Sequence, residues 1–354
     1  MIDFRYHLVS IVAVFLALAI GIVLGSTELQ GSTIDGLHSL NNSLNSKLNA
    51  ASAQRDSYQQ QVSANDTFLQ TAEPKLLGGT LAGQKIVMIT EPGAPSGIID
   101  GIEKAAGTGY AGATVTGTVA LQPKFNDLSG ATRSSLYAIN NELAATRGTV
   151  FAPATDQQTA YQQQAAQLIA SAILNKTNGQ AGLTSGQAQS LLGAYAKSGY
   201  LTTSGAPWNR ATLAVIVAPE SAPADGQNDP ANQVLLAVAA QFALTSAATL
   251  VAGPAASSAS ASSAIAVLRG SGVSGQVSSV DNADSRLGQI STIWALADQQ
   301  AGGKPNSYGL SGASAISPPV PSVSSSTVPG SKPTASSTPT TKATGGVKKT
   351  VKTK

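Results

Sequence analysis

The chain has 354 residues, of which 11% are charged and 42% hydrophobic. An average soluble protein carries roughly 25% charged residues, so this composition excludes a wholly disordered chain and allows a sizeable core. The sequence contains no cysteine, which excludes disulfides, thiolate metal sites and cysteine nucleophiles. Two histidines and two methionines leave few other soft metal ligands.

The net charge of +3 arises from 21 basic and 18 acidic residues and is concentrated near the C-terminus. Six lysines follow residue 330, where no acidic residue occurs: Lys332, Lys342, Lys348, Lys349, Lys352 and Lys354. Without these lysines the acidic residues outnumber the basic ones. The body of the chain therefore offers no broad basic face for nucleic acid.

The N-terminal segment contains no Asp, Glu, Lys or Arg from Tyr6 to Thr27. As an α-helix this run spans about 33 Å, close to the ~30 Å hydrocarbon core of a bilayer. A cleaved signal peptide is the competing interpretation, but Val23-Leu24-Gly25 is a poor cleavage site and the preceding residues are only weakly basic. We therefore predict an uncleaved transmembrane signal-anchor over residues 1–27.

The residues that flank and line this segment predict its orientation and its packing. Arg5 precedes the apolar run and Glu28 follows it, which favours a cytoplasmic N-terminus with the rest of the chain outside the cytoplasm. Gly21 and Gly25 form a small-xxx-small pair, which lets two membrane helices approach closely. The alternative is that they reflect only the general abundance of glycine in membrane helices.

Residues 28–78 are predicted to form a juxtamembrane helix. Leu37, Leu40, Leu44 and Leu48 recur at steps of three and four residues, a narrow apolar stripe typical of a self-associating coiled coil. Asparagines in the same region lower its helix propensity, so pairing would depend on the local concentration that an anchor provides. The alternative is a single helix packed on its own domain.

From residue 79 to 312 the pattern changes to short apolar strands that alternate with helices. The predicted strands are Lys85–Thr90, Ala113–Leu121, Thr149–Ala152, Thr212–Ala218, Ala248–Ala252 and Gln276–Val280. The predicted helices are Gly97–Ala106, Leu128–Thr146, Asp156–Lys176, Ser185–Lys197, Ala231–Leu244, Ser257–Leu268 and Ser285–Gln300. This alternation predicts the α/β class, with a mainly parallel sheet covered on both faces. Residues 153–205 are predicted to be a strand-free helical insert.

Local sequence patterns in this domain predict where helices begin and end. Asp284 is predicted to cap the last helix. Two G-x-G-x-x-G patterns occur, at Gly107, Gly109 and Gly112 and at Gly270, Gly272 and Gly275. Each pattern follows a predicted helix and precedes a strand, the reverse of a dinucleotide-binding fingerprint, so these glycines are predicted to end helices and form turns.

Three carboxylates follow predicted strands: Glu91, Glu220 and Asp281. The carboxyl ends of parallel strands share one edge, where such sheets bind ligands, so the three residues are weak candidates for a hard-cation site or for acid–base chemistry. The alternative is that they are solvated loop residues or helix caps. We assign no catalytic residue and no cofactor, because His7 and His38 flank the membrane segment and no Ser/His/Asp triad can be built.

Residues 313–354 consist mostly of Pro, Ser, Thr, Gly and Lys. Such a segment cannot bury enough apolar surface to fold, and we predict a disordered basic tail. Binding of an anionic cell-wall polymer is one role for this tail, and an inert solvated tail is the alternative.

Several segments resemble the MctB family of mycobacterial copper transport proteins and their actinobacterial relatives. The resemblance is carried by Arg5-Tyr6-His7-Leu8-Val9-Ser10, Val12–Ala19, Gly21-x-Val23-Leu24-Gly25-Ser26, Gln54-Arg55-Asp56, Val280–Asp284, Gly288, Ile293-x-Ala295-Leu296 and Tyr308-Gly309. It covers about residues 1–312, and the N-terminal block is its most specific part. It implies an envelope protein of copper transport, copper efflux or copper homeostasis, described in the family as an outer-membrane, channel-forming protein.

Copper enters these expectations only as a transported ion that the resemblance implies. No set of about ten-residue alternating strands predicts a membrane barrel, so a channel would have to pass through an oligomer or a partner protein. We expect a non-enzymatic, membrane-anchored homo-oligomer that transports copper and binds no nucleic acid. An envelope scaffold that binds partner proteins is the alternative, and a hydrolase that uses the strand-end carboxylates is the third interpretation.

Overall fold

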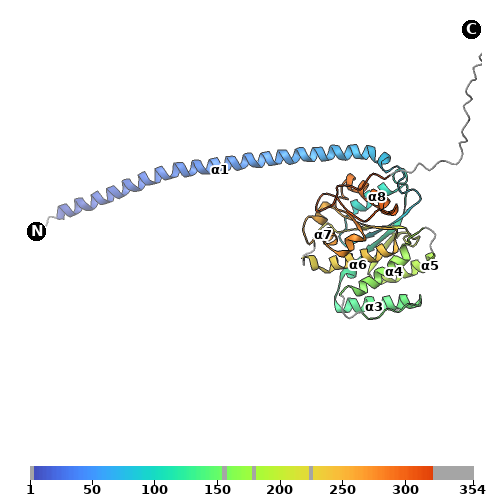
Figure 1. Ribbon diagram of the computed structural model, residues 1–354. Helices are drawn as coiled ribbons and strands as arrows, with labels where there is room; N and C mark the ends of the chain where they lie inside the picture. Colours follow the sequence, from blue (N-terminus) through green and yellow to red (C-terminus); the bar gives the residue numbers. More distant parts are fainter. Residues whose placement is uncertain (1–3, 154–157, 178–180, 223–225, 322–354) are drawn as a thin grey trace, which may run out of the picture. The chain divides into compact units, whose positions relative to one another are not determined.

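The computed structural model describes residues 4–153, 158–177, 181–222 and 226–321. The N-terminal helix α1 runs from Phe4 to Leu77 without interruption, so one helix contains both the predicted anchor and the predicted juxtamembrane segment (Figure 1). Pro74 lies in its last turn. The helix ends at Leu77 because Gly78 and Gly79 follow with φ +33° and +75°, which do not continue a right-handed helix.

The described part of the chain contains one sheet of seven strands in the order β3-β2-β1-β4-β5-β6-β7. Their bounds are β1 Lys85–Thr90, β2 Thr114–Leu121, β3 Leu201–Gly205, β4 Leu213–Val217, β5 Ala248–Ala252, β6 Ser278–Val280 and β7 Ser307–Tyr308. Edge strand β3 is antiparallel to β2, whereas all other neighbouring pairs are parallel. The predicted α/β class with a mainly parallel sheet is confirmed.

Within the described residues, seven further α-helices connect these strands. They are α2 Ser96–Ala106, α3 Gly130–Ala145, α4 Ala160–Ile173, α5 Ser185–Lys197, α6 Pro230–Thr245, α7 Ala264–Arg269 and α8 Arg286–Gln300. Short 3-10 helices are η1 Pro123–Asn126, η2 Gly226–Asn228, η3 Ala255–Ser258 and η4 Gly272–Gly275. Helix α5 begins with a capping box, in which Thr184 Oγ1 accepts from the amide of Gln187.

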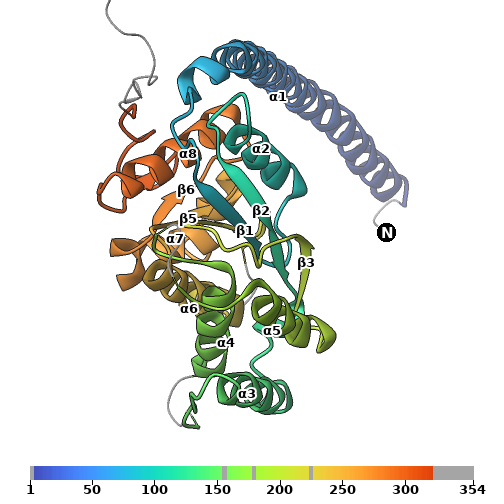
Figure 2. The same cartoon turned by 90° about the vertical axis from the view of Figure 1, so that its right-hand side faces the viewer.

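Helices cover both faces of the sheet and create two apolar cores (Figure 2). On β1, Ile86 and Met88 face the core formed with α2, α8 and the end of α1. Val87 and Ile89 face the other core, which includes side chains from α3 to α7. Because both faces are buried, the central strands are continuously apolar, as predicted.

Two features of the predicted strand set are wrong. Thr149–Ala152 forms no strand, and Val150 is 84% exposed, because these β-branched residues have no neighbouring strand to pair with. The predicted strand-free segment 153–205 instead ends in β3, a mostly exposed strand that pairs with β2. This pairing, rather than an apolar pattern, makes residues 201–205 a strand. The two-residue strand β7 also lacks an apolar pattern, so the sequence does not predict it.

Helix boundaries differ from the sequence pattern at two places. The predicted helix Ser257–Leu268 is divided into η3 and α7. Asp284 does not cap α8, because Ser285 is the N-cap and its Oγ accepts from the amide of Gly288 at 3.1 Å. The predicted role of the first glycine pattern is confirmed, because Gly107 is a C-cap residue and Gly109 and Gly112 have positive φ. In the second pattern Gly270 is a C-cap residue, but Gly272–Gly275 forms η4. Residues 322–354, most of the predicted tail, lie outside the described residues.

Candidate functional site at the carboxyl edge of the sheet

The strand order reverses between β1 and β4. From β1 the chain crosses through α2 to β2 on one side, and β4 to β6 then extend the sheet on the other side. In open α/β sheets, ligands bind outside the carboxyl ends of the strands at such a reversal. The ends of β1 and β4 therefore form the edge at which this fold favours a ligand site.

Glu91 occupies this point directly after β1. Its backbone amide donates to Val217 O at 3.0 Å, which fixes it beside the end of β4. The residue is 4% exposed, Asn126 Nδ2 donates to its Oε2 at 3.3 Å, and its buried Oε1 has no partner in the described part of the chain. Burial raises the pKa of Glu91 to about 7, and the hydrogen bond from Asn126 offsets only part of this rise. Glu91 therefore exchanges a proton near neutral pH.

Asn126 contacts the carboxyl group, and a second amide side chain, that of Gln162, contacts the residue that precedes Asn126. Asn126 ends η1 just after β2, and the fully buried Gln162 of α4 donates to the neighbouring carbonyl of Phe125 at 3.4 Å. Asn126 Oδ1 and Gln162 Oε1 are also buried without a partner among the described residues. Asn126 follows a predicted strand end, as Glu91 does, so the same rule would have found it. Gln162 lies in a run of three glutamines, and nothing in the sequence distinguishes it.

The other two strand-end carboxylates do not join Glu91. Glu220 is exposed after β4, although its amide reaches Gly93 O at 3.5 Å. Asp281 is fully buried after β6, and β5 separates that strand from β4. Within the described residues, no three His, Cys, Asp or Glu side chains are close enough to hold a metal ion.

The oxygens of Asp281 are used in holding the fold together. They accept from Leu310 N at 2.7 Å, Ser311 N at 2.9 Å, Arg269 Nη1 at 2.9 Å and Ser258 Oγ at 2.8 Å. Burial favours a raised pKa for Asp281, but these hydrogen bonds together lower its pKa below the ordinary value. Asp281 is therefore a structural anion.

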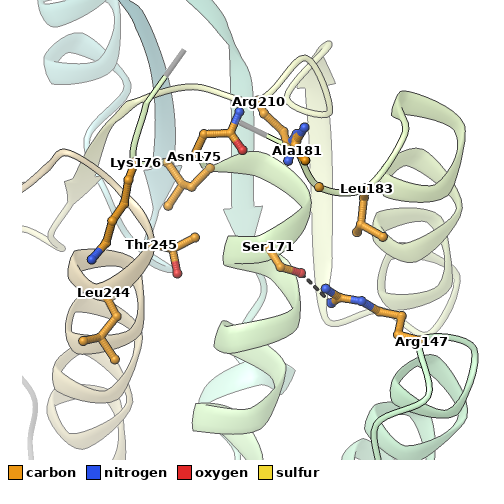
Figure 3. A pocket seen from close by; sticks show the side chains of 11 residues that line it. Arg147, Ser171, Asn175, Lys176, Ala181, Leu183, Arg210, Leu244 and Thr245 are labelled. Carbon is orange, nitrogen blue, oxygen red and sulfur yellow. Dashed lines mark hydrogen bonds between the residues drawn. The ribbon is translucent and has the colours of Figure 1, made fainter. Parts of the chain in front are cut away.

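A cavity of about 250 Å³ lies at the opposite, amino edge of the sheet (Figure 3). Arg147, Lys176 and Arg210 contribute cationic side chains to its wall, and Arg147 Nη1 donates to Ser171 Oγ at 2.7 Å. Arg147 follows α3 and Lys176 follows α4, so their charges complement the negative ends of these helices. This structural role accounts for two of the cations, and we assign no ligand to the cavity.

The last turns of α1 dock on the α/β domain. Glu73 is fully buried, and its Oε2 lies 3.4 Å from Arg286 Nη1. Trp294 Nε1 donates to Leu76 O at 3.2 Å. Burial raises the pKa of Glu73, and the charges of Arg286 and Lys104 partly oppose this rise. No local sequence pattern marks these contact residues, because the joint forms between residues more than 200 positions apart.

At its other end, α1 contains a segment, Phe4–Ser26, that is long and apolar enough to cross a membrane. Gly21 and Gly25 lie in this segment, and a Cβ atom at either position would meet nothing within 4 Å. Leu37, Leu40, Leu44 and Leu48 lie beyond it and are 60–65% exposed, so they do not pack on the chain's own domain.

Together these features define an α/β protein whose covered, mostly parallel sheet is joined to a long helix with a membrane-compatible beginning. The sequence profile of a family described as copper transport outer membrane protein, MctB, matches residues 1–318. The chain therefore belongs to the MctB family.

Curated relatives match over nearly their full lengths. The copper transporter MctB of Mycobacterium tuberculosis (strain ATCC 25618 / H37Rv) is 30% identical over 315 residues, which cover 87% of this chain and 96% of the relative. The copper transporter MctB of Mycobacterium leprae is 29% identical over 328 residues, which cover 90% and 100%, respectively. The family suggested by the N-terminal motifs is confirmed.

Proposed function

We propose that this protein takes part in copper transport at the cell envelope. The observation that carries the proposal is the family match from residue 1 to 318, which includes the apolar segment, the rest of α1 and the whole α/β domain. The relatives are named as copper transporters, which favours a role other than catalysis. Lowering the copper content of the cell is the function that best accommodates these observations.

In this proposal the segment Phe4–Ser26 remains attached as a membrane anchor, with the N-terminus in the cytoplasm. Its apolar length supports the anchor, and Arg5 at its start supports the orientation. The α/β domain then acts outside the cytoplasm. The family description further supports an outer-membrane location, which fractionation of the envelope would test.

The chain's own donors do not suggest a copper cage. Copper sites favour thiolate, thioether and imidazole ligands, but the sequence has no cysteine, and Met88 is buried within β1. The described residues also contain no group of three His, Cys, Asp or Glu placed to hold a metal. We therefore propose that copper moves as a substrate along a path made by several copies or by a partner protein, and we assign no ligand in a single chain.

Intracellular copper measured in a deletion strain tests the proposal. Cells without the protein should accumulate copper and become copper-sensitive, and expression of the full chain should reverse both effects. Identical copper content and tolerance in all strains would contradict copper transport and favour an envelope scaffold. Glu91→Ala and Glu220→Ala test the hydrolase interpretation, whereas Asp281→Ala does not, because Asp281 holds the fold together: loss of function in both variants, with normal protein levels, would support catalysis.

A further inference from the structure

A line of leucines on α1 is exposed to solvent. Leu37, Leu40, Leu44 and Leu48 are 60–65% exposed, and Tyr58 and Val62 further along are 57% and 58% exposed. Long helices in water gain most of their stability from packing an apolar face. In the described chain this stretch of α1 makes no such packing, because the helix contacts its own domain through its last turns. We call Leu37, Leu40, Leu44 and Leu48 the leucine stripe.

The stripe continues a face of α1 that is already an interface. Each residue turns the helix by about 100°, so Leu37 and Glu73, which are about ten turns apart, lie on the same side of the straight helix. Glu73 and Leu77 of this side pack on the domain. The apolar face therefore extends from the docked turns into a stretch that no described part of the chain covers.

The glycine pair lies on another side of α1. At about 100° per residue, Gly21 and Gly25 are roughly 120–160° around the helix from Leu37. Because α1 is uninterrupted from Phe4 to Leu77, this phase difference is preserved along it. Two paired helices touch along one line, so the leucine stripe and the glycine pair cannot both lie at that contact. The geometry therefore separates two association surfaces that the sequence suggested together.

A second copy of the chain fits the stripe better than an unrelated partner. Copies anchored by Phe4–Ser26 run parallel, and each presents its stripe at the same distance, starting about 17 Å beyond Ser26. Between Leu37 and Leu48, self-pairing brings one pair of like charges together, because Lys47 is the one Asp, Glu, Lys or Arg residue there and it shares the heptad position of Leu40. A shared anchor also raises the local concentration of the paired helices.

We propose that α1 pairs with α1 of a second copy, parallel and in register, through the leucine stripe. Pairing twists both helices into a left-handed supercoil with about 3.5 residues per turn. At that pitch Glu73 lies about 100° around the helix from Leu44, so each domain sits beside the seam and leaves room for the partner helix. The dimer holds two α/β domains at one membrane site, whether or not the protein transports copper.

Cysteine cross-linking tests this proposal cleanly, because the natural chain contains no cysteine. Leu37→Cys and Leu44→Cys place one thiol in the proposed seam, and Ser46→Cys is the matched control, about 200° around the helix from Leu44. All three positions are exposed, so the fold should tolerate the changes. Full-length variants in native membranes would be oxidised briefly and separated by mass under non-reducing conditions.

The two seam variants should form disulfide-linked dimers with several-fold higher yield than Ser46→Cys. Adding Leu40→Asn to Leu44→Cys should lower the yield, because it places an amide in the apolar seam. Equal yields from Ser46→Cys and the seam variants would overturn the proposal. Absence of cross-links at every position, with monomeric mass in solubilised protein, would overturn it too. Because the readout is independent of copper, its failure is distinguishable from failure of the proposed function.

Discussion

Arg269 and Asp281 form a buried ion pair in which Nη1 lies 2.9 Å from Oδ2, with side-chain exposures of 10% and 0%. Arg269 also donates to Tyr308 O at 2.8 Å, while Asp281 accepts from the amides of Leu310 and Ser311. The pair therefore ties the end of β6 to β7 and the loop that follows it. This closure explains why a carboxylate at a strand end serves the fold rather than a ligand.

Replacing Asp281 by alanine should destabilise the protein strongly, because the Arg269 cation would remain buried without its anion. Breaking one side of a buried ion pair typically costs about 3–5 kcal/mol. Denaturant unfolding of the full chain in detergent measures this loss. Glu220→Ala is the matched control and should change stability by less than about 0.5 kcal/mol, because Glu220 is exposed. Similar effects of the two substitutions would contradict the proposed closure.

Gly309→Ala should weaken the same closure. Gly309 has φ +129°, which L side chains rarely adopt, and an added Cβ atom would collide with Asp281 Oδ1. We expect faster proteolysis of the segment after β7, together with a lower midpoint of thermal unfolding. Gly302→Ala is a control for positive φ alone, because a Cβ atom there would meet nothing within 4 Å. The closure model is wrong if both alanine variants lose the same stability.

Glu91 predicts a pH dependence of stability. Its folded pKa of about 7 lies above its ordinary value of 4.5, so the folded state binds the proton more tightly than the unfolded state. This stabilisation is complete below pH 4.5 and is lost as the pH rises through 7. Glu91→Gln stays neutral and should therefore become more stable than wild type at alkaline pH, by at most about 3 kcal/mol.

The test for Glu91 is a pair of unfolding curves measured at a series of pH values. The free energies of unfolding of wild type and Glu91→Gln should separate progressively above pH 4.5 and stop separating above pH 7. The control variant is Asp100→Asn, which removes the charge of an exposed carboxylate on α2. Parallel profiles for wild type and Glu91→Gln would show that burial does not hold the proton on Glu91.

The docking of α1 should depend on Glu73 and Trp294. Glu73→Ala removes the buried partner of Arg286, and Trp294→Phe removes the hydrogen bond to Leu76 O. Loss of one such hydrogen bond costs about 1 kcal/mol, so the double variant should expose the 78–84 turn to protease sooner. Asp56→Ala is the control, because its exposed pair with Arg55 contributes little. Equal cleavage rates in the double variant and this control would contradict the described joint.

The sequence was sufficient to predict the parts of the fold that depend on local apolar patterns. The central strands β1, β4 and β5 are continuously apolar and were predicted almost to the residue. Edge strand β3 is polar, and it becomes a strand only because β2 lies beside it. Val150 shows the converse, since a β-branched run without a neighbouring strand stays irregular.

The candidate site was predictable only in part, because it too depends on contacts between segments far apart in the sequence. Strand-end position selected Glu91, but the same rule also selected Asp281, whose role depends on contacts with Arg269 and Leu310 from other segments. Gln162 of α4 donates to Phe125 O, beside Asn126, and no local pattern marks it. Strand order and long-range hydrogen bonds, which a linear pattern does not contain, decide which carboxylate is structural and which one is free to exchange a proton.

The most direct test of the account is intracellular copper content in a deletion strain that expresses either the full chain or a secreted form beginning at Ser26. We predict that the full chain restores low copper content, whereas the secreted form, at equal abundance, does not. Equal restoration by both forms would contradict the anchored copper transporter described above, and so would restoration by neither form.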